Sequence, residues 1–234
     1  MNFFKRLGGV FFEPKATFQG LAERPVWADM LVFLLIILAA YSLLISPYTR
    51  HDQLMMMKDS AKLKETLGEE RFNQQIQSLE NPSTATTVWT LVYGPVFIFI
   101  ALLLQSVLLL IFGRFMSTQG TFKQVFSALV HASAVNLFLG NAVRLVLILM
   151  RKSAFQTSTS LALLFPRLEV TSKAYVILTQ IDIFQLWMFA VLAFGLAAIF
   201  KIEVKKSLFL SYVLWFLKSL ANIGLALWGM HFLQ

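Results

Sequence analysis

Five long apolar segments set what this chain of 234 residues can fold into. The first contains residues 30–49, a run of 20 residues without a charged side chain. A helix of that length, at about 1.5 Å per residue, crosses a hydrocarbon layer roughly 30 Å thick. Five such helices and a mostly helical remainder leave no room for a sheet. The sequence therefore predicts an all-α, polytopic integral membrane protein with five transmembrane helices.

The predicted spans form one membrane domain over residues 27–230. They cover about 27–46, 88–112, 122–150, 174–200 and 207–230. Of all residues 58% are hydrophobic and only 14% are charged, whereas soluble proteins carry about 25% charged residues. Residues 47–87 are the polar exception, with five basic and six acidic side chains. We predict that they form a charged helical loop outside the membrane.

The N-terminal segment, residues 1–26, begins with a short amphipathic pattern. Its apolar residues recur on one helical face, two basic residues lie beside them, and Glu13-Pro14 ends the pattern. The residues of this predicted interfacial helix are Phe3, Phe4, Lys5, Arg6, Leu7 and Phe11. A basic, phenylalanine-rich helix of this kind is typical of the membrane interface. Packing on the cytoplasmic end of the bundle is the alternative.

Basic residues near the span ends predict the orientation. With the N-terminus inside, the inner segments and the outer loops each hold nine lysines and arginines. The inner nine lie in short segments next to the spans, where the positive-inside rule applies best, although the basic loop 151–173 argues against this orientation. We expect a cytoplasmic N-terminus and an outside C-terminus in a cell membrane, which in a bacterium is the inner membrane. The basic residues are also expected to contact anionic lipid.

Several polar side chains fall inside the predicted spans, where an unpaired charge is costly and is a site hypothesis by default. The candidate cluster consists of Asp182, Arg144, Lys218, Asn222, Gln185, Asn141 and His131. Helix geometry puts Asp182 and Arg144 about 10–13 Å below the same membrane face. We predict an ion pair of Asp182 with Arg144 or with Lys218. The cluster is either structural glue between helices or a transport or ligand site.

The sequence carries no constellation that predicts catalysis. It has no cysteine, and its three histidines are too far apart in sequence for a short-range metal motif. Gly-rich phosphate loops, HExxH and GxSxG are also missing, so no catalytic, cofactor or metal residues are predicted. The net charge of +8 comes without an aromatic and basic groove pattern, and nucleic acid is not an expected partner.

Several stretches resemble one known family. They are Phe11-Phe12-Glu13-Pro14 with Phe18 and Pro25, Phe112-Gly113-Arg114-Phe115, Gly120-Thr121-Phe122-Lys123-Gln124, and Ile181-Asp182-Ile183-Phe184-Gln185-Leu186-Trp187 followed by Gly195. Their order and spacing are similar to those of the Yip (Ypt/Rab-interacting protein) domain family, in its short bacterial-type form. The resemblance implies a five-span membrane protein with a cytoplasmic N-terminus. Eukaryotic relatives act in vesicle traffic, binding Rab GTPases and one another without known catalysis.

The sequence also departs from that family pattern. It lacks the long N-terminal extension of eukaryotic members, so Rab binding is not expected. His131 and its neighbours replace the tyrosine and proline usual in the third span, and the charged segment 47–87 reads as an insert.

The sequence is compatible with two functions. The first is a non-catalytic protein that organises membrane partners or lipid, or associates with itself, in a trafficking or scaffold-like role. Its docking surfaces would be the N-terminal helix and the loop 47–87. The alternative is a small transporter or channel subunit, with Asp182, Arg144, Lys218 and His131 along a polar path. Breaks at Gly94-Pro95 and Gly140-Asn141 would support that alternative.

Overall fold

Helices make up nearly all of the regular structure in the computed structural model, which describes residues 1–155, 157 and 159–231. The elements are α1 (Phe3–Phe12), α2 (Pro14–Glu23), α3 (Ala28–Asp59), α4 (Ala61–Leu67), α5 (Glu69–Glu80), α6 (Thr84–Arg114), α7 (Phe122–Ala132), the π-helix η1 (Val135–Gly140), α8 (Asn141–Arg151), the 3-10 helix η2 (Leu161–Leu164), α9 (Lys173–Thr179), α10 (Ile183–Phe200) and α11 (Val204–His231). The described residues form no strand beyond one isolated bridge between Ser160 and Asp182.

Five of these helical units are long and apolar enough to cross a membrane. They are α3, α6, the continuous run Phe122–Arg151 made of α7, η1 and α8, then α10, and α11 up to Gly229. The predicted all-α, five-helix membrane fold is therefore confirmed. The exact membrane boundaries within these helices stay a prediction.

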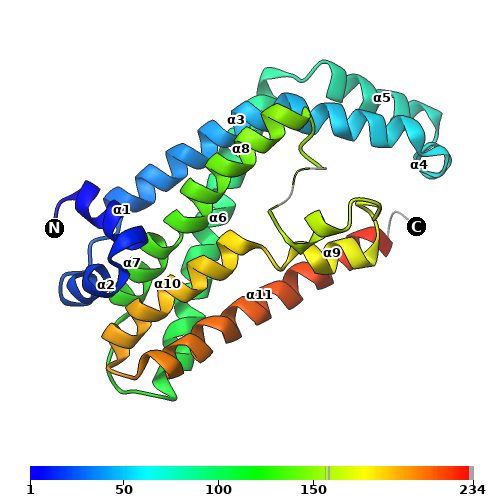
Figure 1. Cartoon of the computed structure of the whole chain (residues 1–234). Coiled ribbons are helices and arrows are strands. Elements are labelled where there is room, and N and C mark those ends of the chain that lie inside the picture. Colours follow the sequence, from blue (N-terminus) through cyan, green and yellow to red (C-terminus); the bar gives the residue numbers. More distant parts are fainter. Residues whose placement is uncertain (156, 158, 232–234) are drawn as a thin grey trace.

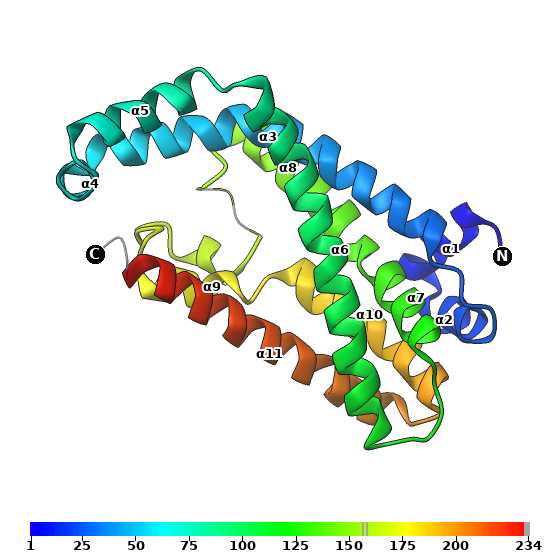
Figure 2. The ribbon, with the colours of Figure 1, turned by 180° about the vertical axis from the view of Figure 1, so that it is seen from behind.

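Helix α10 lies at the centre of the bundle, where it packs against α11, α2 and α7. Helix α6 packs on α7 and α3 from the other side (Figure 2). The short helices α1 and α2 lie across one end of the bundle, while the far half of α3 joins α4 and α5 in an arm at the opposite end (Figure 1). Helix α11 ends at that opposite end too, as an odd number of spans requires.

The tightest core is where α2, α7 and α10 meet. Phe18, Leu129, Phe189 and Leu192 are fully buried there. Gly195 lets α10 approach closely, because a Cβ on it would lie 2.8 Å from the Phe18 ring and 3.0 Å from the Ala128 methyl group. By contrast, the outward face of α6 exposes large apolar side chains such as Trp89, Phe97 and Leu104. Exposed apolar surface along a membrane-length helix is what contact with lipid requires.

The amphipathic helix predicted at the N-terminus forms as α1, with the Asn2 side chain accepting a hydrogen bond from the Lys5 amide. One face packs on the bundle: Val10 is fully buried, and Arg6 is buried in an ion pair with Asp29. The other face leaves Phe4 and Phe12 78% and 87% exposed. The two alternatives are thus compatible, since α1 packs on the bundle and still presents aromatic rings outward. Its position at the membrane interface stays a prediction.

The structure adds detail to the predicted segments and interrupts one of them. The charged segment 47–87 is helical over most of its length, because its first residues extend α3 to Asp59 before α4 and α5 begin. Its position outside the membrane stays a prediction. The segment 174–200 is not one helix, because α9 ends at Thr179 and α10 starts at Ile183. At Gly94-Pro95 and Gly140-Asn141, where the sequence predicts breaks, the backbone stays helical, with a change from π-helix to α-helix at the second position. Helix α6 continues through Pro95, and a π-helix carries the third unit through to Asn141.

Replacing Gly195 by alanine is expected to destabilise the protein by about 1–3 kcal/mol, because the added methyl group overpacks the junction with Phe18. Thermal unfolding in mild detergent measures the change. Gly224→Ala in α11 is the matched control, since a Cβ there has no neighbour within 4 Å and alanine favours a helix. Equal melting temperatures for the two variants would show that the close approach of α10 contributes nothing.

Candidate functional site

Asp182 lies at the start of α10, where it is the N-cap residue. Its Oδ1 accepts hydrogen bonds from the backbone N–H groups of Phe184 and Gln185, at 2.9 and 3.0 Å. The backbone at Asp182 is extended and bridges to Ser160, with the Leu161 N–H donating to the Ile181 carbonyl at 2.9 Å. Aspartate is a strong N-cap because its oxygens satisfy amides that a helix start leaves unpaired. This explains why the predicted fourth helix is interrupted.

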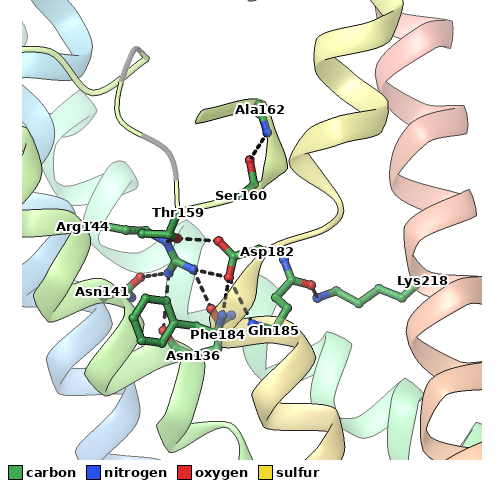
Figure 3. Close-up of polar contacts among 10 residues, drawn as sticks. All are labelled: Asn136, Asn141, Arg144, Thr159, Ser160, Ala162, Asp182, Phe184, Gln185 and Lys218. Atoms are coloured by element: carbon green, nitrogen blue, oxygen red, sulfur yellow. Dashed lines mark hydrogen bonds and ion pairs between the residues drawn. The ribbon is translucent and has the colours of Figure 1, made fainter. Parts of the chain in front are cut away.

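Arg144 of α8 reaches across the bundle to this carboxylate (Figure 3). Its Nη2 lies 3.0 Å from Asp182 Oδ1. The same guanidinium donates to Asn141 Oδ1 at 2.9 Å, to Asn136 Oδ1 at 2.8 Å and to Thr159 Oγ1 at 3.0 Å. Thr159 in turn donates to the other carboxylate oxygen, Oδ2. Of the two pairs that the sequence left open, the structure forms Asp182–Arg144.

The π-helix η1 positions the arginine. It places Asn136 and Asn141 on the side of the helix that faces Arg144, where both amide oxygens accept from the guanidinium. Gly140 ends η1, and a Cβ on it would lie 3.1 Å from both Arg144 Nη1 and the Phe184 side chain. Single π-turns within α-helices are frequent at functional sites.

The ion pair is largely closed off from solvent. The side chains of Asp182 and Arg144 are only 7% and 17% exposed, and the guanidinium lies over the Phe184 ring, 5.7 Å from its centroid. Asp182 precedes the membrane-length helix α10.

Lys218 and Asn222 of α11 join the cluster only indirectly. The Lys218 amino group donates to Gln185 Oε1 at 2.8 Å (Figure 3). It also lies over the Phe189 ring. Asn222 donates to Gln180 Oε1 at 3.2 Å rather than to Asp182. The predicted alternative pair Asp182–Lys218 is therefore not formed, and Gln185 stands between the two charges.

His131 does not belong to the cluster. Its Nδ1 lies 2.9 Å from the carbonyl oxygen of Ser127, one turn earlier in α7, and the ring is fully buried. Thirteen residues separate it from Arg144, which is about 20 Å along the helical run. The residues that complete the site instead are Asn136, Thr159 and Phe184. The spacing Asp182-x-x-Gln185 is a helix-start signal that could have located the break, whereas nothing in the sequence marks Thr159.

The two charged groups of the pair are hydrogen-bonded to neighbouring side chains and helix amides. Arg144 uses its donors on four side chains of the cluster, and Asp182 uses both oxygens. Three cavities of about 1130, 400 and 640 Å³ in the described part of the chain are lined by other residues. The cluster thus clasps η1 and α8, the segment at Thr159, and α10, with α11 attached through Gln185.

Removing either charge of the pair is expected to cost about 3–5 kcal/mol of stability, because the remaining charge stays buried without its partner. Asp182→Asn keeps a good N-cap, and Arg144→Gln keeps a polar side chain. The double variant is expected to lose less than the sum of the two, with a coupling of about 0.5–3 kcal/mol in thermal unfolding. Glu80→Gln, which breaks the exposed pair with Lys58, is the control and should change stability by less than about 0.5 kcal/mol. Simple additivity at the buried pair contradicts the clasp.

Comparison with known proteins assigns the chain to a family. Searches of curated proteins and of solved structures gave no match. A family model, the Yip1 domain, matches residues 8–226, which is nearly the whole chain, and confirms the resemblance. The protein belongs to the Yip1-domain family of membrane proteins.

Proposed function

We propose that this Yip1-domain protein is a non-catalytic scaffold that organises other membrane proteins, or further copies of itself, in a trafficking-like role. The observation that carries the proposal is the satisfied ion pair between Arg144 and Asp182. Both charged groups are paired with each other and bonded to neighbouring side chains and helix amides, and the Phe184 ring covers the guanidinium. A site that bound and released a polar substrate would need free donors and acceptors facing a water-filled space.

The arm formed by the far half of α3 with α4 and α5 is the first proposed docking surface. It carries exposed charges of both signs, and the ion pairs Lys58–Glu80 and Lys64–Glu69 lie on its surface. Phe72 is buried where α5 packs on α3, which gives the arm a fixed shape. A rigid, charged projection from a membrane bundle is suited to contact with a partner outside the bilayer.

The helices α1 and α2 are the second proposed docking surface, at the opposite end of the bundle. We infer that this end is cytoplasmic and that the arm lies outside, in a cell membrane, from the basic residues that flank the spans here. The exposed rings of Phe4 and Phe12 suit a helix resting at the membrane interface.

A small transporter or channel subunit remains the second candidate. The observation in its favour is Lys218, whose amino group bonds to the neutral Gln185 and is separated from Asp182. A cation within a membrane-length helix is a functional-site hypothesis by default. The loss of His131 from the cluster and the continuous helices at Pro95 and Asn141 weaken this candidate.

Replacing residues 60–79 by a short glycine-serine linker is expected to remove stoichiometric partners that copurify from the native membrane in mild detergent. The linker can be short because Lys58 and Glu80 are joined by an ion pair. Removal of the N-terminal helices is unsuitable, since Val10 and Phe18 are core residues. Phe4→Ser with Phe12→Ser probes that surface instead. If both variants keep every partner and every self-association of the parent protein, the scaffold role assigned to these surfaces is wrong.

A further inference from the structure

A groove lies between α2 and the end of α10, at the end of the bundle that carries α1. Its volume is about 640 Å³, which is within the range of small-molecule sites. It is separate from the clasp, because Asp182 is at the other end of α10 and neither Asp182 nor Arg144 lines it.

The floor of the groove is apolar. Phe194, Ala197 and Ala198 of α10 form it, together with Ile202 just beyond the helix end. Two small side chains in succession leave a shallow channel along a membrane-length helix. Such a floor offers nothing to a fully hydrated anion, but it can pack against hydrocarbon.

The rim of the groove is basic. Lys15 of α2 lies on one side, and Lys201, which caps α10 in a left-handed conformation with φ 55°, lies on the other. Glu23 is the acidic residue of the lining. The surrounding segments 1–29, 114–123 and 201–206 together carry nine basic and four acidic residues, so the field at this end favours an anion.

The rim lies where phospholipid headgroups are expected. Phe4 and Phe12 project from α1 at the same end of the bundle, and aromatic rings exposed beside lysines are typical of segments resting at the acyl boundary. Lys15 follows Phe12 by three residues, across the turn between α1 and α2. A phosphate held by the rim would therefore leave its acyl chains directed at the lipid.

We propose that this groove binds one anionic phospholipid, with its phosphate between Lys15 and Lys201 and an acyl chain along the α10 floor. The charge of the rim selects an anion, and the apolar floor selects a lipid over a soluble phosphate. The inference goes beyond the scaffold role and stands separately from it, because it is measured by lipid binding and not by partner capture.

The test is a titration of phosphatidylglycerol into the full chain in neutral detergent, with bound lipid counted by native mass spectrometry. Lys15→Gln and Lys201→Asn are each expected to weaken binding about fivefold, and more when combined, while phosphatidylcholine binding stays unchanged. Asparagine at 201 tolerates the left-handed backbone, so the variant removes the charge and keeps the fold.

Two further variants separate this groove from general surface charge. Lys123→Gln removes an exposed lysine outside the groove and should weaken binding less than Lys15→Gln or Lys201→Asn does. Ala198→Leu narrows the floor without altering charge and should weaken phosphatidylglycerol binding, measured at a temperature at which the variant is folded. Unchanged binding by the double lysine variant, or an equal loss in Lys123→Gln, overturns the proposal. Displacement of the lipid by inorganic phosphate, or full binding by Ala198→Leu, overturns its assignment to a lipid.

Discussion

The bundle depends on keeping one buried ion pair, Arg144–Asp182, fully satisfied. Removing two charges from water costs several kcal/mol per ion unless geometry and further hydrogen bonds compensate. Here Asn136 and Asn141 accept from the guanidinium, and the first amides of α10 donate to the carboxylate. The backbone departs from a regular α-helix at two places, the extended Asp182 and the π-helix η1. Both departures place the groups whose hydrogen bonds offset the cost of burying the two charges.

Different interactions hold the two ends of α10, polar contacts at one end and apolar packing at the other. The rest of the fold is arranged around these two ends. At one end the polar clasp joins α10 to α8 and, through Gln185, to α11. At the other end Gly195 allows close apolar packing against Phe18 and Ala128. Because the central helix α10 is held at both ends, the Yip1-domain bundle can carry the arm at one end and the helices α1 and α2 at the other. Such a layout suits a protein that arranges partners and lipid.

The sequence predicted the five helices well, because apolar length is a strong signal when the solvent is lipid. It also brought Arg144 and Asp182 to similar depth, since helix rise converts residue number into distance. It failed at the break before α10, because Ile181 and Ile183 continue the apolar run and hide the Asp182-x-x-Gln185 start signal. It also grouped His131 with the cluster because the residue is polar, although the same helix rise places it about 20 Å from Arg144. Thr159 comes from an irregular segment, where no periodicity exists to place it.

The claim that the cluster is a sealed clasp is tested most directly by its access to water. The chain has no cysteine, so a single introduced thiol reports its own surroundings. In permeabilised membranes, Asn141→Cys is predicted to resist a charged maleimide until the protein is denatured, because Asn141 is buried beside Arg144. Ser78→Cys on the exposed arm should react at once. If both thiols react at the same rate in the folded protein, the cluster lines a water-filled path and is not a sealed clasp.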